Sequence, residues 1–330
     1  MLSESRLVSR RGMRISLVAI LAPLLAAGAA LVGKRTAHAE DATGDQAEQN
    51  ERCAVRLSIA LTGKSPTASQ LTASNPQSSV DAMLGTPEFA DRYASFVNAE
   101  FNGGPITAAN DDPIYALAKH VITEKMPWSD LFQGPYSLTA GATTTDEMQV
   151  GDDADGLGYF RSDSWRKRYA GNEEKGIMLV AAFRIVQNTT GLELTPSIGQ
   201  PGDVRNEEGR KNSPCRSCHF DSWYAIDTVA SLLPLRTGTG TAAKFPERSV
   251  APVQLLGKTL SSDKDLVNAL VESDSFKFNQ CRMVFKFLYG RPENQCEAKT
   301  FDACVTALET TKTIQSAVAA VAKDASFCTN

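Results

Sequence analysis

Histidine is scarce in this chain: the 330 residues contain three, His38, His120 and His219. The chain therefore has few histidines from which to build a hydrolytic Ser-His-Asp site or a metal site with several imidazole ligands. The chain also lacks an excess of positive charge, since its formal net charge is −4. Nucleic acid and anionic membrane surfaces are consequently poor partners.

What the chain does contain is a five-residue motif past its middle, Cys215-Arg216-Ser217-Cys218-His219. This spacing is typical of a c-type haem attachment site. In that chemistry Cys215 and Cys218 form thioethers with one haem, and His219 is the proximal iron ligand. A zinc site is one alternative, but it would require a second Cys-x-x-Cys or His-x3–5-His pair, which the sequence lacks. A redox dithiol is the other, and it is expected in a βαβ setting. We predict one covalent haem c.

The first 39 residues have the organisation of an export signal. A basic start is followed by an apolar run from Ile15 to Val32 and by Ala37-His38-Ala39, which predicts cleavage after Ala39. We expect a periplasmic or secreted protein without stable membrane insertion after cleavage. An uncleaved anchor is the alternative, because a run of roughly 18 apolar residues can just span a bilayer. Ser9-Arg10-Arg11 leaves open whether export follows the Sec or the twin-arginine route.

The signal peptide carries six of the 34 Lys and Arg residues and one of the 38 Asp and Glu residues, so the remaining chain is more acidic than the whole. Its cysteine usage fits an oxidising compartment. The cysteines outside the haem motif are Cys53, Cys281, Cys296, Cys304 and Cys328. Four of them fall in the last fifty residues, which predicts two disulfides there, with the pairing left open. Cys53 is remote in sequence and is our candidate for the unpaired thiol; five buried, reduced cysteines are the alternative.

Apolar spacing predicts a mostly α protein. We expect a multi-helix domain with long loops, a cytochrome c-like haem-attachment helix and a disulfide-stapled C-terminal helical part. The expected regions are a signal peptide (1–39), an N-terminal helical region (40–132), a loop-rich helical connector (133–214) and a haem-attachment and C-terminal helical region (215–330). The principal expected helices cover 51–62, 87–101, 164–170, 174–187, 215–233, 263–289, 300–310 and 312–323, with a polar leader before them at 41–48 and long loops at 133–157 and 189–214.

Four further segments resemble, in the same order, the planctomycete-type cytochrome c-associated domain families. They are Arg56-Leu-Ser-Ile-Ala-Leu-Thr-Gly63, Ser79-Val-Asp-Ala-Met-Leu-Gly-Thr-Pro-Glu-Phe-Ala-Asp-Arg-Tyr93, Lys125-Met-Pro-Trp-Ser-Asp-Leu131 and the stretch from Cys281 to Pro292 with its Gly-Arg-Pro end. The resemblance covers much of residues 50–300 and implies an exported haem protein. It carries over only the two cysteines and the histidine of the haem motif.

The second axial position of the iron is open at this point. His120 is the only other histidine after the signal peptide, and Met283 lies in an apolar helix where methionine is also ordinary core material. The other methionines, or no protein ligand, are further alternatives. We expect an electron-transfer protein with a redox protein partner, rather than an enzyme. A haem enzyme with an open distal site (peroxidase-like) and a helical interaction domain with ancillary haem are the alternatives. The sequence leaves open the reduction potential of the haem and the oligomeric state of the protein.

Overall fold

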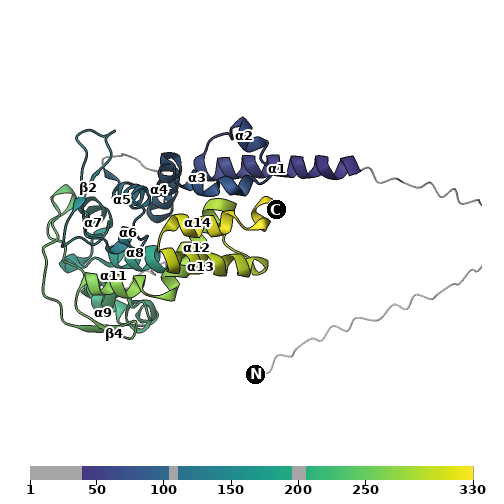
Figure 1. The fold of residues 1–330 in the computed structure, drawn as a ribbon. Coiled ribbons are helices and arrows are strands. Elements are labelled where there is room, and N and C mark those ends of the chain that lie inside the picture. The colour runs from purple at the N-terminus through teal and green to yellow at the C-terminus, as the bar shows by residue number, and fades with distance from the viewer. Residues whose placement is uncertain (1–38, 104–110, 195–205, 330) are drawn as a thin grey trace, which may run out of the picture.

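The structure, a computed structural model, describes residues 39–103, 111–194 and 206–329 (Figure 1). The expected signal peptide therefore lies outside the described residues except for Ala39, as does the middle of the expected loop at 189–214. Within the described ranges the chain is mostly helical, with two small antiparallel hairpins, which confirms the fold class. None of the helices in these ranges is both long enough and apolar enough to cross a membrane.

All the regular elements of the N-terminal region are helices where it is described. Its elements are α1 (Ala39–Thr62), α2 (Ala68–Leu71), η1 (Pro76–Ser79), α3 (Val80–Leu84), α4 (Pro87–Asn102), α5 (Pro113–Thr123) and α6 (Asp130–Gln133). Local chemistry sets the ends of α4: the Thr86 side chain accepts a hydrogen bond from the Phe89 amide, and Gly103 ends the helix with φ +71°. The start of α1 differs from our expectation, because the polar leader at 41–48 is part of this helix, whose first turns project from the body (Figure 1).

The connector contains more regular structure than its loop-rich sequence predicts. It holds β1 (Tyr136–Thr139), β2 (Gln149–Asp152), α7 (Asp163–Tyr169), η3 (Glu174–Gly176), α8 (Leu179–Thr190) and α9 (Glu207–Arg210). β1 and β2 pair as an antiparallel hairpin inside the segment predicted to be a loop. The predicted helix at 174–187 is a short 3-10 turn followed by α8, because residues 175 and 176 both have positive φ.

The segment predicted as one haem-attachment helix, 215–233, is interrupted. It consists of a π-helical turn, η4 (Ser217–Asp221), and a separate short helix, α10 (Ile226–Ser231). The Ser222 side chain accepts a hydrogen bond from the Ala225 amide between them, so a turn replaces continuous helix. η5 (Gly240–Ala242) and a second hairpin, β3 (Val253–Leu255) with β4 (Lys258–Leu260), follow.

The C-terminal region is a group of helices: α11 (Asp263–Val271), α12 (Asp274–Tyr289), η6 (Gln295–Glu297), α13 (Ala298–Thr311), α14 (Ile314–Ala322) and α15 (Ala325–Thr329). The sequence predicted one helix over 263–289, but Ser273 divides it. The Ser273 side chain accepts a hydrogen bond from the Phe276 amide and so caps the second helix. A continuous apolar core extends from α1 to α15 and includes many aromatic side chains.

Two disulfides fasten this arrangement. Cys281 of α12 pairs with Cys304 of α13, and this is the only one of the two disulfides expected within the last fifty residues that forms there. Cys53 pairs with Cys328, so the prediction that Cys53 is the unpaired thiol is wrong. The reason is the chain path: α1 and α15 lie side by side although 275 residues separate the two cysteines (Figure 1). Cys296 is the exposed free thiol instead.

Candidate haem-attachment site

The haem motif lies on a short turn of irregular helix. Ser217, Cys218 and His219 belong to the π-helical turn η4, and the His219 amide donates to the carbonyl of Cys215 at 3.2 Å. The Ser217 hydroxyl donates to the Pro214 carbonyl at 3.0 Å, which ties the turn to the preceding loop. Single π-helical turns are rare in proteins, and those that do occur are often found at functional sites. This turn brings the second thiol and the imidazole of the motif onto one short element.

Both motif cysteines are free thiols and are partly exposed. Four of the five other cysteines are joined in disulfides, so the structure separates these two from the cysteines with a structural role. The Tyr224 hydroxyl donates to Cys218 Sγ at 3.3 Å, and this contact raises the pKa of Tyr224. The side chain of Trp223 is 48% exposed beside the turn. The thiol of Cys218 thus lies next to the Tyr224 side chain, whose neighbour Trp223 is open to solvent.

His219 is held through one of its two ring nitrogens. Its Nδ1 lies 2.6 Å from Oδ2 of Asp227, which is the second residue of α10. The aspartate side chain is 7% exposed and the histidine side chain 24%. A carboxylate can only accept, so Nδ1 carries the proton and donates. Nε2 is consequently the nitrogen with a lone pair available for a metal.

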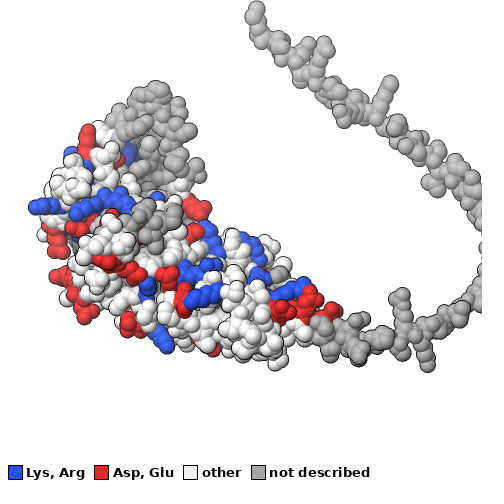
Figure 2. All heavy atoms as spheres, turned by 90° about the horizontal axis from the view of Figure 1, so that it is seen from above, with Lys and Arg blue, Asp and Glu red and all other residues white. Residues whose placement is uncertain are grey.

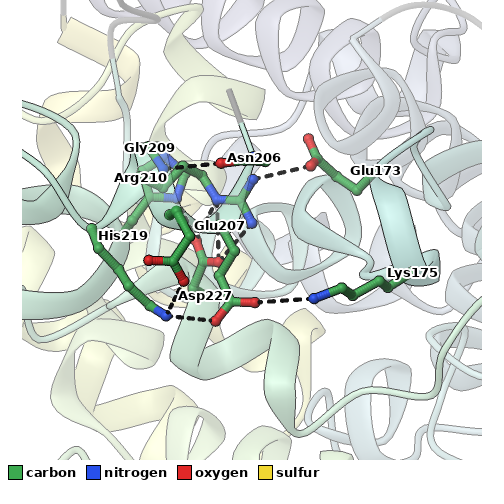
Figure 3. Close-up of polar contacts among 10 residues, drawn as sticks. Glu173, Lys175, Asn206, Glu207, Gly209, Arg210, His219 and Asp227 are labelled. Atoms are coloured by element: carbon green, nitrogen blue, oxygen red, sulfur yellow. Dashed lines mark hydrogen bonds and ion pairs between the residues drawn. The ribbon is translucent and has the colours of Figure 1, made fainter. Parts of the chain in front are cut away.

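Asp227 is in turn held by Arg210, at the end of α9 (Figure 3). Arg210 Nε donates to Asp227 Oδ2 at 3.0 Å, and Nη2 donates to Oδ1 at 2.8 Å, so the contact is bidentate. Nη1 of the same guanidinium donates to Glu173 at 3.1 Å on the other side. The Arg210 side chain is also 7% exposed. The imidazole is therefore oriented by a largely buried ion pair rather than by a flexible surface residue.

The charge state of Asp227 follows from two opposing effects. Burial alone would raise the pKa of this carboxyl group, but the hydrogen bonds from His219 and Arg210, together with the charge of Arg210, outweigh burial and lower it. Asp227 is therefore ionised at neutral pH. An ionised acceptor fixes the tautomer of the histidine and makes its free nitrogen more basic.

The two named candidates for the second axial ligand lie in other parts of the fold. His120 is on α5 and packs edge-on against the ring of Tyr136, with 5.3 Å between centroids. Met283 is on α12, is 8% exposed and belongs to the apolar core. The principal packing partner of η4 is α10, whereas α5 packs mainly on α4 and α12 mainly on α8. The principal packing of these elements therefore does not place either residue beside His219.

The remaining methionines of the described chain give no clearer candidate. Met83, Met148 and Met178 are buried, and Met126 packs against the core. Within the described residues there is no cluster of three or more His, Cys, Asp or Glu side chains arranged to hold a metal ion. A haem site needs only one of these side chains as an iron ligand, together with the two thiols.

Sequence reasoning missed the residues that support the histidine. Asp227, Arg210 and Glu173 carry no motif: Asp227 lies on α10, Arg210 on α9, and Glu173 is the residue before η3. The one available signal was the acid eight residues after His219, in a segment that was expected to be uninterrupted helix. Residues eight apart lie on the same face of a helix but about two turns away from each other, so that expectation argued against contact. The break between η4 and α10 is what brings the two together.

Comparison with known proteins adds no assignment: no family model matches the chain, and no curated protein or solved structure is similar to it. The resemblance to the cytochrome c-associated families therefore stays a hypothesis. The function has to be inferred from the geometry of the site itself.

Proposed function

We propose that this chain is an exported monohaem c-type cytochrome that acts in electron transfer. Cys215 and Cys218 would form the thioether bonds to haem, and His219 would be the proximal iron ligand. The observation that carries the proposal is the hydrogen bond between His219 Nδ1 and the ionised Asp227. Histidine ligands of metals usually donate their other ring N–H to a carboxylate or carbonyl group, and this one is already arranged to do so.

The residues present fit the group that the motif implies. Two free thiols lie within a four-residue span, next to an imidazole whose tautomer leaves Nε2 available. When bound, haem supplies an iron that exchanges single electrons between two oxidation states. The chain's own part is to hold the group at fixed positions and to orient the ring of His219 through Asp227. Partial exposure of the turn and of Trp223 gives a redox protein partner access to this edge of the molecule.

Export is the second part of the proposal. Thioether attachment and disulfide formation both belong to compartments outside the reducing cytoplasm. The two disulfides support such a location, and the basic and apolar start of the sequence supports a cleaved signal. Charged side chains of both signs are interspersed over the face in Figure 2. That pattern does not favour a polyanionic partner such as nucleic acid.

The test replaces both thiols in the full-length chain, expressed in a host that matures c-type cytochromes. We expect unaltered protein in the exported fraction to keep haem on a denaturing gel, and Cys215→Ala with Cys218→Ala to lose it. Cys296→Ala is the matched control, since it also removes a free thiol and should keep the haem. Haem retained by the double variant, or absent from the unaltered protein, would overturn the proposal.

A further inference from the structure

The Asp227 carboxylate accepts hydrogen bonds from two groups, the imidazole of His219 and the guanidinium of Arg210. Its Oδ2 accepts both from His219 Nδ1, at 2.6 Å, and from Arg210 Nε, at 3.0 Å. A carboxylate that accepts from an imidazole increases the electron donation of that ring to a metal. An arginine on the same oxygen withdraws part of that charge. The strength of the histidine as a ligand then depends on the balance between the two contacts.

We propose that Asp227 and Arg210 set the reduction potential of the His219-ligated iron in opposite directions, Asp227 lowering it and Arg210 raising it. This inference rests on the proposed function. Both are positioning residues, which act on the iron through His219. Hydrogen bonding to the axial ligand and burial are two of the means by which a protein adjusts such a potential.

Burial makes the two charges effective. The side chains of Asp227 and Arg210 are each 7% exposed, so water screens them little. Negative charge that reaches the iron through His219 would favour the ferric state, and positive charge would favour the ferrous state. Glu173 contacts the far side of Arg210 at 3.1 Å and is 31% exposed, so it adds a weaker negative contribution. The direction in which each residue is expected to shift the reduction potential therefore follows from its charge and its contact in the site.

The experiment measures the reduction potential of the exported holoprotein by spectroelectrochemical titration. Asp227→Asn keeps the shape and one acceptor oxygen but removes the charge, so we expect the potential to rise. Arg210→Gln removes the opposing cation and leaves the carboxylate, so we expect the potential to fall. Arg210→Lys keeps the charge without the bidentate contact and should return the potential towards that of the unaltered protein.

The chain offers a matched control in a second bidentate pair. Arg161 Nε and Nη2 donate to Asp263 at 3.2 and 2.7 Å, with the same donor atoms as in the site, and the side chains are 20% and 11% exposed. Asp263→Asn and Arg161→Gln should destabilise the fold without a comparable shift in potential. A role limited to folding would affect both pairs alike and would leave the potential unchanged.

The outcomes separate the two claims. Opposite shifts for Asp227→Asn and Arg210→Gln, each larger than those of the control variants, support the inference. Shifts of the same sign, or no larger than the controls, overturn it while the haem assignment stands. If Arg210→Gln does not fold, the inference is still tested by two other variants. It requires that the reduction potential rises in Asp227→Asn and stays near that of the unaltered protein in Arg210→Lys. An unaltered protein without covalent haem overturns the proposed function and this inference together.

Discussion

Gly176 permits a close approach of two chain segments that support the site, and replacing it should be costly. It ends η3 with φ +73°, three residues after Glu173, the partner of Arg210. A Cβ atom at this position would overlap the backbone carbonyl oxygen of Arg236. The Arg236 amide also donates to the carbonyl of Gly176 at 2.8 Å. Gly176→Ala must therefore move one backbone segment away from the other.

Three contributions give the expected magnitude. A side chain in the left-handed region costs about 1 kcal/mol, overpacking against atoms that cannot yield costs about 2 kcal/mol, and loss of the Arg236 hydrogen bond costs about 1 kcal/mol. Because these overlap, we expect Gly176→Ala to lower the free energy of unfolding by about 3 kcal/mol. Gly290, the residue that ends α12, has φ +71°, but a Cβ atom added there would have no neighbour within 4 Å. Gly290→Ala should then cost only the first contribution, about 1 kcal/mol.

Urea unfolding of the oxidised proteins, followed by far-UV circular dichroism, compares the two variants directly. The pair shares the backbone conformation and differs in the neighbouring atoms, so the difference between them isolates the close approach at Gly176. Equal destabilisation of Gly176→Ala and Gly290→Ala would refute the reasoning, because the close approach of the Arg236 backbone would then make no contribution to the loss of stability.

Three further outcomes follow from contacts elsewhere in the fold. Replacing Cys53 and Cys328 together by Ala should lower the free energy of unfolding by about 2–5 kcal/mol, because their disulfide closes a very long loop; chemical denaturation checks this. Tyr93→Phe should raise stability by about 1 kcal/mol in the same assay, since among the described residues the buried Tyr93 hydroxyl has no hydrogen-bond partner. The hydrogen bond from Arg291 lowers the pKa of Glu297, so this pair stabilises the fold above the unfolded pKa of about 4.3 and loses that effect as pH falls through the folded value. Glu297→Gln should therefore destabilise the protein at pH 7 more than at pH 3, as urea titrations at the two pH values would show.

Parts of the fold could be predicted because their signals are local. The start and end of α4 lie within one residue of the predicted 87–101, since Thr86, Pro87 and Gly103 act on their immediate neighbours. The beginning of α1 was missed because residues 41–48 have no apolar periodicity to mark a helix. The division between α11 and α12 was missed for the opposite reason. Apolar residues continue across Ser273, and only its side-chain hydrogen bond reveals the break.

Long-range relations could not be predicted in the same way. The sequence predicts an unpaired Cys53 because no other cysteine lies near it along the chain, yet the packing of α1 against α15 brings Cys328 to it. Spacing along the chain gives the number of possible pairings but not the path that selects one. A disulfide in the C-terminal region could be expected from the cluster of cysteines there, but the sequence left open which of them would pair, and the packing of α12 against α13 selects Cys281 and Cys304.

The candidate site has one part that local sequence signals reveal and another that depends on long-range contacts. Its two thiols and its imidazole are contiguous, as attachment of one haem under the proposed function would require, and a contiguous motif can be recognised from sequence alone. Its support comes from α9, from α10 and from the residue before η3, so Arg210, Asp227 and Glu173 become neighbours only in the folded chain. The motif specifies where a haem would be attached, whereas the buried charges specify how strongly His219 would donate to its iron. Proteins with the same five residues can therefore differ in potential, and for this chain the opposite signs expected for Asp227 and Arg210 make that difference measurable.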